Sequence, residues 1–362
     1  MTTTEGMKAG GYYDHHSEYQ QRVAATGAEL IRDAVTRVTP LQKGESFVIA
    51  DYGCSTGKSS AASMRTAVDA VRAAEPERAI AAIHNDVPTN DWNTLFANVA
   101  ADPDGYARAA GPPVVPMASA VSFFDAATTA GSVHLGMSFS AAHWLRTQPT
   151  VSVPGFYQCE ATGDARDSLA AQADADWTRF LTMRALDLAA GGRLVVQMVG
   201  TATSAPPAEP QVTARALLRA MAEVAGTMAD EGLLEPAAVD AYVLPVYARS
   251  IDEARRPLEA AGSDLAAAFE VETVRTDAVA NPYLDAWKQD HDAAAYGKSY
   301  AAFVRGFTES SLREHLFTPG TRGLPVDELL DDYFARLEAR FAADPEADAF
   351  EDWTLTVVVA RR

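Results

Sequence analysis

The residues best placed to do chemistry lie in one short stretch, residues 47–60, which reads F-V-I-A-D-Y-G-C-S-T-G-K-S-S. A short apolar run ends at Asp51, and Gly53 and Gly57 follow with small residues between them. An alanine-rich stretch with a helical amphipathic pattern, 59–74, comes next. A buried strand, a glycine turn that admits a ligand to the backbone, and a helix N-terminus facing that ligand would give this pattern. The stretch is typical of a nucleotide-binding turn.

Two ligands compete for this turn, a phosphate group and the cationic amino-acid end of S-adenosylmethionine (SAM). The residues Gly57, Lys58 and Ser59 suggest a phosphate-binding P-loop, but that motif needs four residues between its glycines and this chain has three. An acidic side chain at the strand end, Asp51, would repel phosphate and suit a positively charged group. The D-x-G-x-x-x-G pattern therefore favours SAM over ATP. A strand-to-helix turn that binds no ligand is the remaining alternative.

Composition sets limits on the class of protein. The chain has 362 residues, of which 48% are hydrophobic and 22% charged, so it can form one large domain or two ordinary ones. Its net charge of -19 makes a nucleic-acid or anionic-membrane partner unexpected. Two cysteines, Cys54 and Cys159, cannot form a framework of disulfides, which favours a reducing cytoplasm. We expect neither a signal peptide nor a membrane span.

Strand and helix patterns alternate along the chain, which predicts an α/β fold with a parallel, doubly wound sheet. Seven strands are expected, at 47–50, 79–83, 114–118, 133–139, 193–199, 269–279 and 354–360. Further helical stretches could cap the carboxyl ends of the strands. We expect one integrated unit over 1–362, with a SAM-binding core at about 40–200, 240–280 and 350–362 and a helical cap at about 12–38, 205–236 and 281–345.

A second acidic residue, Asp86, ends the second expected strand. In open α/β sheets the ligand lies at the carboxyl ends of the strands, and an acid at the end of strand two accepts hydrogen bonds from ribose hydroxyls. The alternative is a turn or helix cap, which the sequence Asp-x-Pro supplies. Because Asp51 ends a neighbouring strand, we favour the ribose role.

Three ordered segments carry a family pattern: A-D-Y-G-C-S-T-G at 50–57, H-N-D-V-P-T-N-D-W-N-T-L-F at 84–96, and H-W-L at 143–145. Together they resemble the SABATH family of SAM-dependent carboxyl methyltransferases, which act on salicylate, benzoate, jasmonate, indole-3-acetate and, in some branches, xanthine-alkaloid nitrogen. The likeness continues through nearly the whole chain, at 191–195, 230–234, 244–247, 304–309 and the last strand. It implies a seven-stranded Rossmann-like sheet with a largely helical cap over the strand carboxyl ends.

The resemblance also implies the cofactor and its contacts. SAM would be the methyl donor and S-adenosylhomocysteine the product, held by Ser17, Asp51, Gly53, Asp86, Val87, Ser122 and Phe123. Phe123 would lie against the adenine. Ser59 stands where plant members usually have asparagine, and we assign it a contact to the methionine end. No metal is expected, because the adjacent histidines at 15 and 16 point apart and no further ligand has suitable spacing.

For the substrate, the resemblance places a carboxylate between Gln20 and Trp144. Their amide and indole N–H groups are neutral donors, which can orient a carboxylate without neutralising the lone pair that attacks the methyl group. Judged from the residues alone, Ser17 and Gln20 fit a capping box and Trp144 fits a core position. A carboxylic acid is ionised at neutral pH, so we expect no general base. The other implied substrate contacts are Tyr13, Ser140, His143, Leu217, Leu218, Val304 and Phe307.

Departures from the plant pattern shape the substrate prediction. Ser140 replaces a tyrosine and His143 a methionine, and His143 could be a ligand contact, a proton carrier or a solvent-facing loop residue. Aliphatic side chains at 217, 218 and 304 suggest a flexible acid, such as a medium-chain fatty acid or an arylalkanoic acid, rather than salicylate. The alternatives are an N-methyltransferase of a small heterocycle and a SAM-binding protein without activity. A homodimer is possible, as in relatives.

Overall fold

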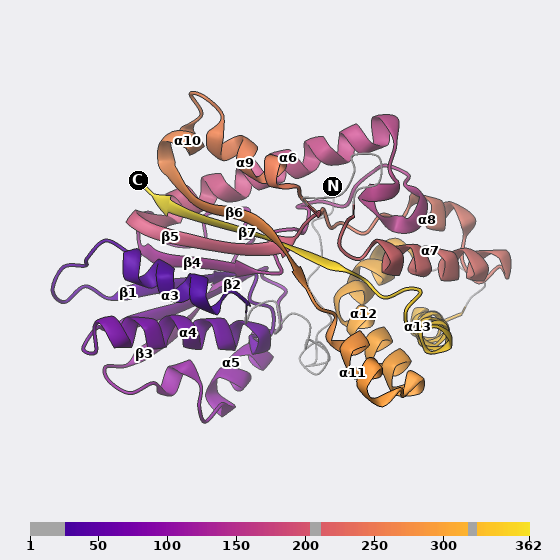
Figure 1. Ribbon diagram of the computed structural model, residues 1–362, viewed down its shortest axis with the longest axis horizontal. Helices are drawn as coiled ribbons and strands as arrows, with labels where there is room; N and C mark the ends of the chain where they lie inside the picture. Colours follow the sequence, from indigo (N-terminus) through magenta and orange to yellow (C-terminus); the bar gives the residue numbers. More distant parts are fainter. Residues whose placement is uncertain (1–25, 203–210, 318–323) are drawn as a thin grey trace.

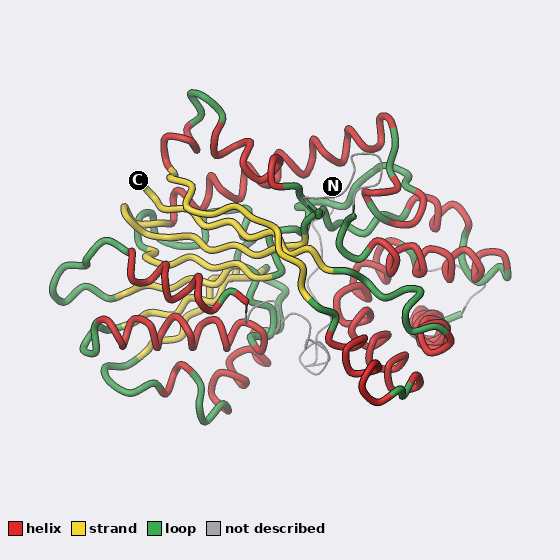
Figure 2. The backbone as a smooth tube through the Cα atoms, viewed as in Figure 1, coloured by secondary structure: helices red, strands yellow, loops and turns green. Residues whose placement is uncertain are grey.

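The computed structural model describes residues 26–202, 211–317 and 324–362. A twisted sheet with helices on both faces forms one end of the molecule, and a helical region forms the other (Figure 1). The same division is visible along the backbone, where the strands run side by side (Figure 2). The carboxyl ends of all strands but β7 point toward the helical region. We call this helical region, which contains α7, α8 and α11 to α13, the cap.

All seven expected strands are present, and the sheet order is β3-β2-β1-β4-β5-β7-β6. Their bounds are β1 Phe47–Tyr52, β2 Ile80–Asp86, β3 Val114–Ala120, β4 Val133–Phe139, β5 Leu188–Val199, β6 Phe269–Val279 and β7 Asp352–Arg361. The buried strands are apolar over most of their length, as strands covered on both faces must be.

The sheet is parallel and doubly wound, as expected, except at one strand. β7 pairs antiparallel with both β5 and β6, and its first residue, Asp352, lies opposite Val279 at the carboxyl end of β6. The cause is the path of the chain. It leaves β6 at that edge, forms the last three helices of the cap, and re-enters the sheet from the same side. A strand entered at the carboxyl edge has to run in the opposite direction.

The helices on the sheet are α3 Ala28–Arg37, α4 Lys58–Ala74 and α5 Trp92–Ala101 on one face, and α6 Gly163–Asp187, α9 Ile251–Glu259 and α10 Asp264–Ala268 on the other. The cap helices are α7 Arg215–Asp230, α8 Pro236–Ala241, α11 Pro282–Asp290, α12 Ala293–His315 and α13 Val326–Ala343. Two details differ from expectation. The helix expected in the cap at 12–38 is described from Ala28 onward as α3, and it packs against α4 and β5. The strand expected at 193–199 begins earlier, at Leu188, directly after α6 ends at Asp187.

Parallel register brings the chemistry-bearing strand ends together. Asp51 pairs with His84 of β2 on one side and with Met137 of β4 on the other. Both Asp51 and Asp86 therefore lie at the carboxyl edge of the sheet, next to the loop that follows β4. The cap stands beyond this edge (Figure 1).

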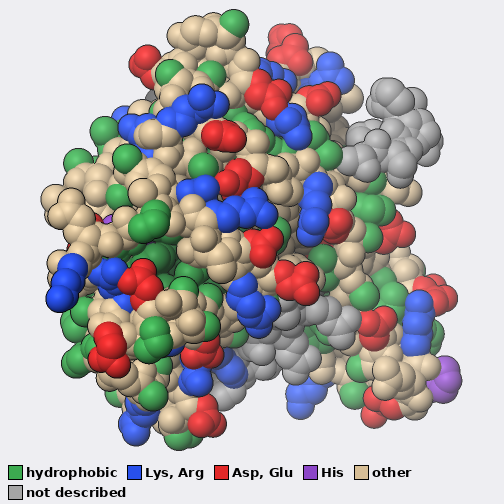
Figure 3. Space-filling model, turned by 60° about the vertical axis from the view of Figure 1, so that its left-hand side comes forward, with side chains coloured by type: hydrophobic (Ala, Val, Ile, Leu, Met, Phe, Trp, Pro, Cys, Tyr) green, Lys and Arg blue, Asp and Glu red, His purple; other side chains and the backbone are tan. Residues whose placement is uncertain are grey.

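Acidic and basic side chains are interspersed on the surface. On the face shown in Figure 3, acidic and basic side chains of the described residues lie next to one another. Within the described ranges, no helix has the length and apolar character that crossing a membrane requires.

The cap is held by close packing between α12 and α13. A Cβ at Gly297 of α12 would lie 2.5 Å from the carbonyl oxygen of Glu338 and 2.8 Å from the Cβ of Ala342. Both distances are too short for real contacts, so the two helices approach this closely only because residue 297 has no side chain.

We predict that Gly297→Ala lowers the free energy of unfolding by about 1–3 kcal/mol, because the added methyl group overpacks the α12–α13 contact. The matched control is Gly226→Ala in α7, where a Cβ would meet nothing within 4 Å. That change should stabilise the protein by up to about 1 kcal/mol through helix propensity. Urea unfolding of both variants measures the difference, and equal stabilities would contradict the packing.

Candidate active site

The strand, glycine turn and helix predicted at residues 47–60 are present. Gly53 and Gly57 both have φ of +87°, in the left-handed region that favours glycine. A Cβ at Gly53 would lie 2.2 Å from the Cβ of Ala141, so the turn contacts the loop after β4. The backbone N–H of Gly53 donates to the carbonyl of Asn85 at 2.8 Å, which ties the turn to the end of β2.

Asp86 holds the turn in place. One of its carboxylate oxygens accepts from the backbone N–H of Ser55 at 2.7 Å, and the other accepts from the N–H of Val87 at 2.8 Å. Burial raises the pKa of Asp86, and these two backbone N–H groups oppose that effect. Each carboxylate oxygen has a second lone pair for another donor. The ribose role predicted for Asp86 is compatible with this geometry.

Asp51 is buried, with 3% of its surface exposed, and its Oδ2 has no hydrogen-bond partner among the described residues. Burial raises its pKa to about 7, the Ser60 side chain lowers it and the nearby charge of Asp86 raises it. A buried carboxylate oxygen without a partner is costly unless a ligand supplies the partner. The cationic methionine end of SAM has the right charge and donors, whereas a phosphate would be repelled. The residues present therefore fit SAM.

Phe123 lies on the other side of the turn. Its ring is 3.6 Å from the position that a Cβ of Gly53 would occupy. It is half-buried and packs against Phe124 and, edge-on, against Phe180, so one part of the ring stays available to a ligand. Ser122 precedes it, and its hydroxyl accepts from the backbone N–H of Phe124 at 3.2 Å.

The structure thus brings Asp51, Gly53, Asp86 and Phe123 together at one edge of the sheet. Ser59 belongs to the first turn of α4, and Ser17 lies outside the described residues. The contacts that these residues make to SAM stay predictions.

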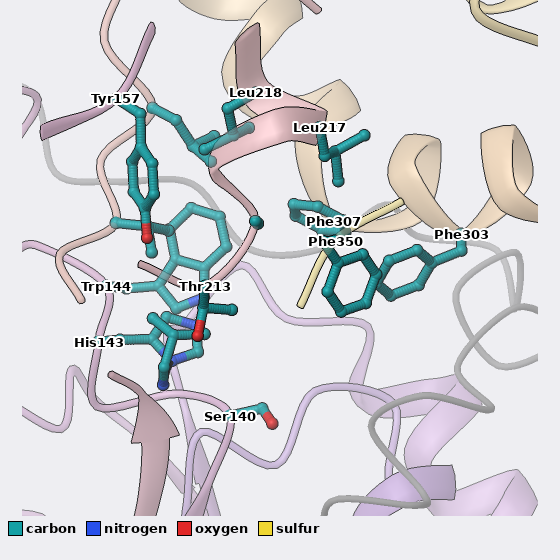
Figure 4. Close-up of a pocket in the computed structure, with 14 residues that line it drawn as sticks. Ser140, His143, Trp144, Tyr157, Thr213, Leu217, Leu218, Phe303, Phe307 and Phe350 are labelled. Atoms are coloured by element: carbon teal, nitrogen blue, oxygen red, sulfur yellow. Dashed lines mark hydrogen bonds between the residues drawn. The ribbon is translucent and has the colours of Figure 1, made fainter. Parts of the chain in front are cut away.

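A pocket lies between this edge and the cap (Figure 4). Its walls come from the loop after β4, the end of β5, the start of α7, and α12. Six of the predicted substrate residues line it: Ser140, His143, Trp144, Leu217, Leu218 and Phe307. Tyr13 and Gln20 lie outside the described residues.

Val304 is the predicted substrate residue that the structure places elsewhere. It is fully buried in the cap core, whereas Phe303 and Phe307 line the pocket. These two are four residues apart and so share one face of α12, while position 304 turns away from that face.

The polar end of the pocket is formed by His143 and Trp144. His143 is 7% exposed, so a solvent-facing loop position is wrong for it. Its Nδ1 accepts from the backbone N–H of Val199 at 3.3 Å, which leaves the ring proton on Nε2. Burial, and secondly the charge of Arg249, lowers its pKa to about 3. His143 is therefore neutral at pH 7, and its Nε2–H is available as a hydrogen-bond donor.

Trp144 is half-buried beside His143, with their ring centroids 6.1 Å apart. Its backbone is fixed by a hydrogen bond to the carbonyl of Ala141 at 3.0 Å and by a β-bridge to Val246. Its indole N–H has no hydrogen-bond partner among the described residues. Two neutral N–H donors are thus available at one end of a pocket whose other walls are almost entirely apolar.

Eight lining residues were not predicted from the sequence: Tyr157, Val199, Thr213, Ala214, Leu244, Val246, Phe303 and Phe350. Most come from loops or strand ends, where no periodic pattern marks an inward-facing side chain. Their identities correct one expectation. The walls are not mainly aliphatic, because aromatic rings at 303, 307 and 350 face the leucines of α7 (Figure 4).

Comparison with known proteins decides the family. The chain matches the family model of SAM-dependent carboxyl methyltransferases over residues 1–362. The chain belongs to this family. It is 28% identical to the O-methyltransferase acrG of Aspergillus aculeatus, over 98% of this chain and 97% of that protein. It is 27% identical to the jasmonate O-methyltransferase of Arabidopsis thaliana, over 69% of this chain and 72% of that protein.

The solved structure of loganic acid methyltransferase with S-adenosylhomocysteine shares the fold, with a TM-score of 0.79, 21% identity and 98% coverage of both chains. The predicted family, fold class and cofactor are thereby confirmed, and the protein is a SAM-dependent carboxyl O-methyltransferase. Within the described residues, no three His, Cys, Asp or Glu side chains are grouped to hold a metal ion.

We predict that SAM affinity rises with pH between 5.5 and 7.5. Asp51 has to ionise before it can pair with the methionine ammonium, and its pKa is raised to about 7. As the pH rises toward 7, the dissociation constant for SAM should fall by up to about tenfold per pH unit. Above pH 7 it should level off. Titration calorimetry measures the dissociation constant over this pH range, in which the ammonium group of SAM stays mostly protonated.

The test variant is Asp51→Asn, which should weaken SAM binding and flatten the pH profile. The control is Asp69→Asn, a change at an exposed carboxylate of α4 that pairs with Arg65. A pH profile that keeps its slope in Asp51→Asn would remove Asp51 from the cofactor site.

Proposed function

We propose that this methyltransferase esterifies an apolar carboxylic acid, and that His143 and Trp144 position the carboxylate by neutral hydrogen bonds. The observation that carries the proposal is the pocket itself. Neutral N–H donors lie at one end, on the loop after β4 that also contacts the glycine turn through Ala141, and apolar side chains form most of the remaining wall. A carboxylate bound at that end would lie between the proposed cofactor site and the cap.

Bound SAM would supply an electrophilic methyl group on its sulfonium, which a carboxylate oxygen could attack directly with S-adenosylhomocysteine as the leaving group. The residues of the chain need only bind, orient and exclude water, because the acid is already ionised at neutral pH. Trp144 and His143 replace part of the water around the carboxylate with fixed donors. Alignment of this kind can contribute up to roughly 7–11 kcal/mol by analogy with intramolecular reactions. Gln20, the third proposed donor, lies outside the described residues.

The apolar walls favour an acid without further polar groups. A hydroxyl group buried against Leu217, Phe303 or Phe350 would find no partner there, at a cost of about 1–3 kcal/mol. A medium-chain fatty acid or an arylalkanoic acid avoids this cost. One relative is named for an acid without further polar groups: the farnesoic acid carboxyl-O-methyltransferase of Arabidopsis thaliana is 26% identical, over 71% of this chain and 75% of that protein.

Two further proposals concern the setting of the enzyme. We propose a reducing, cytoplasmic location, which the free thiols of Cys54 and Cys159 support. We also propose a homodimer, by analogy with the family. Light scattering of the purified protein measures its mass.

We predict that Trp144→Phe lowers kcat/KM by about 10–100-fold, the value of a hydrogen bond to a charged group, while SAM affinity stays within about twofold. The substitution keeps most of the ring. The control is Trp287→Phe, because Trp287 packs against His291 and Tyr296 in the cap and does not line the pocket. Wild-type kinetics in Trp144→Phe would show that the carboxylate binds elsewhere.

We also predict a rise in kcat/KM along a series of straight-chain acids. Each buried methylene contributes about 0.8 kcal/mol, or roughly fourfold, until the pocket is full. Rates with butanoate to dodecanoate, 3-phenylpropanoate, benzoate and salicylate measure the preference. A preference for salicylate or benzoate, with no rise along the aliphatic series, would exclude the flexible acid.

A further inference from the structure

Arg249 is a buried cation beside the pocket. Its side chain is 1% exposed, and the guanidinium donates to the carbonyl oxygens of Ala173 at 2.8 Å and Ala142 at 3.3 Å. The rings of Trp177 and Tyr247 lie 5.6 and 5.7 Å from it. Within the described ranges, no carboxylate oxygen lies within 4.0 Å of its nitrogens. A buried guanidinium usually has an anionic partner, so this arrangement needs an explanation.

The nearest acidic side chains are bound to other groups. Asp176 accepts from the backbone N–H of Arg146 at 2.9 Å, and Glu253 accepts from the hydroxyl of Tyr247 at 2.7 Å. Burial lowers the pKa of Arg249 to about 10, and both carboxylates oppose that effect from a distance. Arg249 therefore keeps its charge at neutral pH, without a direct counter-ion.

This charge lies directly behind the polar end of the pocket. Ala142, whose carbonyl Arg249 binds, precedes His143 and Trp144 in the chain. Through Ala173 the guanidinium joins this loop to α6. The charge also acts on His143, because it adds to the lowering of that pKa. Both the position of the loop and the potential at its donors depend on Arg249.

We infer that Arg249 is a positioning residue for an anionic substrate: it fixes the loop that carries His143 and Trp144, and its unpaired charge offsets the burial of a carboxylate. The inference rests on the proposed function. A carboxylate that enters an apolar pocket loses hydration, and neutral donors restore only part of that loss. The charge of Arg249, on the far side of the loop that carries the donors, lowers the remaining free-energy cost of burying the carboxylate. It does so without contacting the lone pair that attacks the methyl group. The carboxylate of the bound substrate then provides the negative charge that balances Arg249, since no protein carboxylate of the described residues contacts it.

The test compares an acid with its neutral isostere. Binding of 3-phenylpropanoate and 3-phenylpropanamide is measured by calorimetry in the presence of S-adenosylhomocysteine, and the ratio of their affinities is the readout. Arg249→Met should reduce this ratio at least tenfold, and Arg249→Lys should keep most of it. A merely structural role would weaken both ligands alike. The control is Arg166→Met in α6, which removes the same charge from a side chain that is 69% exposed.

A second variant acts in the opposite direction and does not depend on the folding of Arg249→Met. Asp176→Asn removes a negative charge near Arg249, and the amide oxygen of asparagine can still accept from the backbone N–H of Arg146. The acid-to-amide ratio should then rise a few-fold. A rise in this variant supports the inference. An unchanged ratio in Asp176→Asn, together with an unchanged ratio in Arg249→Met where that variant folds, overturns it. A wild-type protein that binds acid and amide equally contradicts the proposed function itself.

Discussion

The parallel pairing of β1 with β2 and β4 is the constraint on which the rest of the site depends. It places Asp51 beside His84 and Met137, and so sets the carboxyl ends of three strands at one edge. The glycine turn follows β1 directly and is held by the carboxylate of Asp86 at the end of β2. A slip of one residue in this register would turn Asp51 to the opposite face of the sheet.

The cap is joined to the same edge by β7. This strand lies between β5 and β6, and Asp352 at its start accepts a hydrogen bond from the Thr213 hydroxyl at 3.1 Å, just before α7 begins. The pocket walls on α7 are therefore fixed relative to the strand ends.

Esterification by displacement consumes one negative and one positive charge. A largely apolar pocket suits it, because the transition state carries less charge than the separated ions and gains from the loss of water.

The sequence was informative where local patterns are strong. Apolar runs predicted all seven strands, and the acids at two strand ends predicted the edge at which the ligand would lie. It was less informative where tertiary packing decides. The direction of β7 depends on the path through the cap, and the choice of Phe303 over Val304 depends on the rotational phase of α12. Nothing near Arg249 in the sequence shows that its side chain is buried without a carboxylate, because its neighbours Tyr247 and Ser250 would also suit a surface loop.

The central claim is that a substrate carboxylate oxygen attacks the SAM methyl group directly and displaces S-adenosylhomocysteine, in a pocket that only positions the acid. The most direct measurement is mass spectrometry of the ester formed from SAM and an acid labelled with ¹⁸O in both carboxylate oxygens, such as labelled octanoate. Direct displacement predicts a methyl ester that retains both labelled oxygens, with one S-adenosylhomocysteine formed per ester. Loss of one labelled oxygen would mean that the acyl group is activated first, and it would contradict this account.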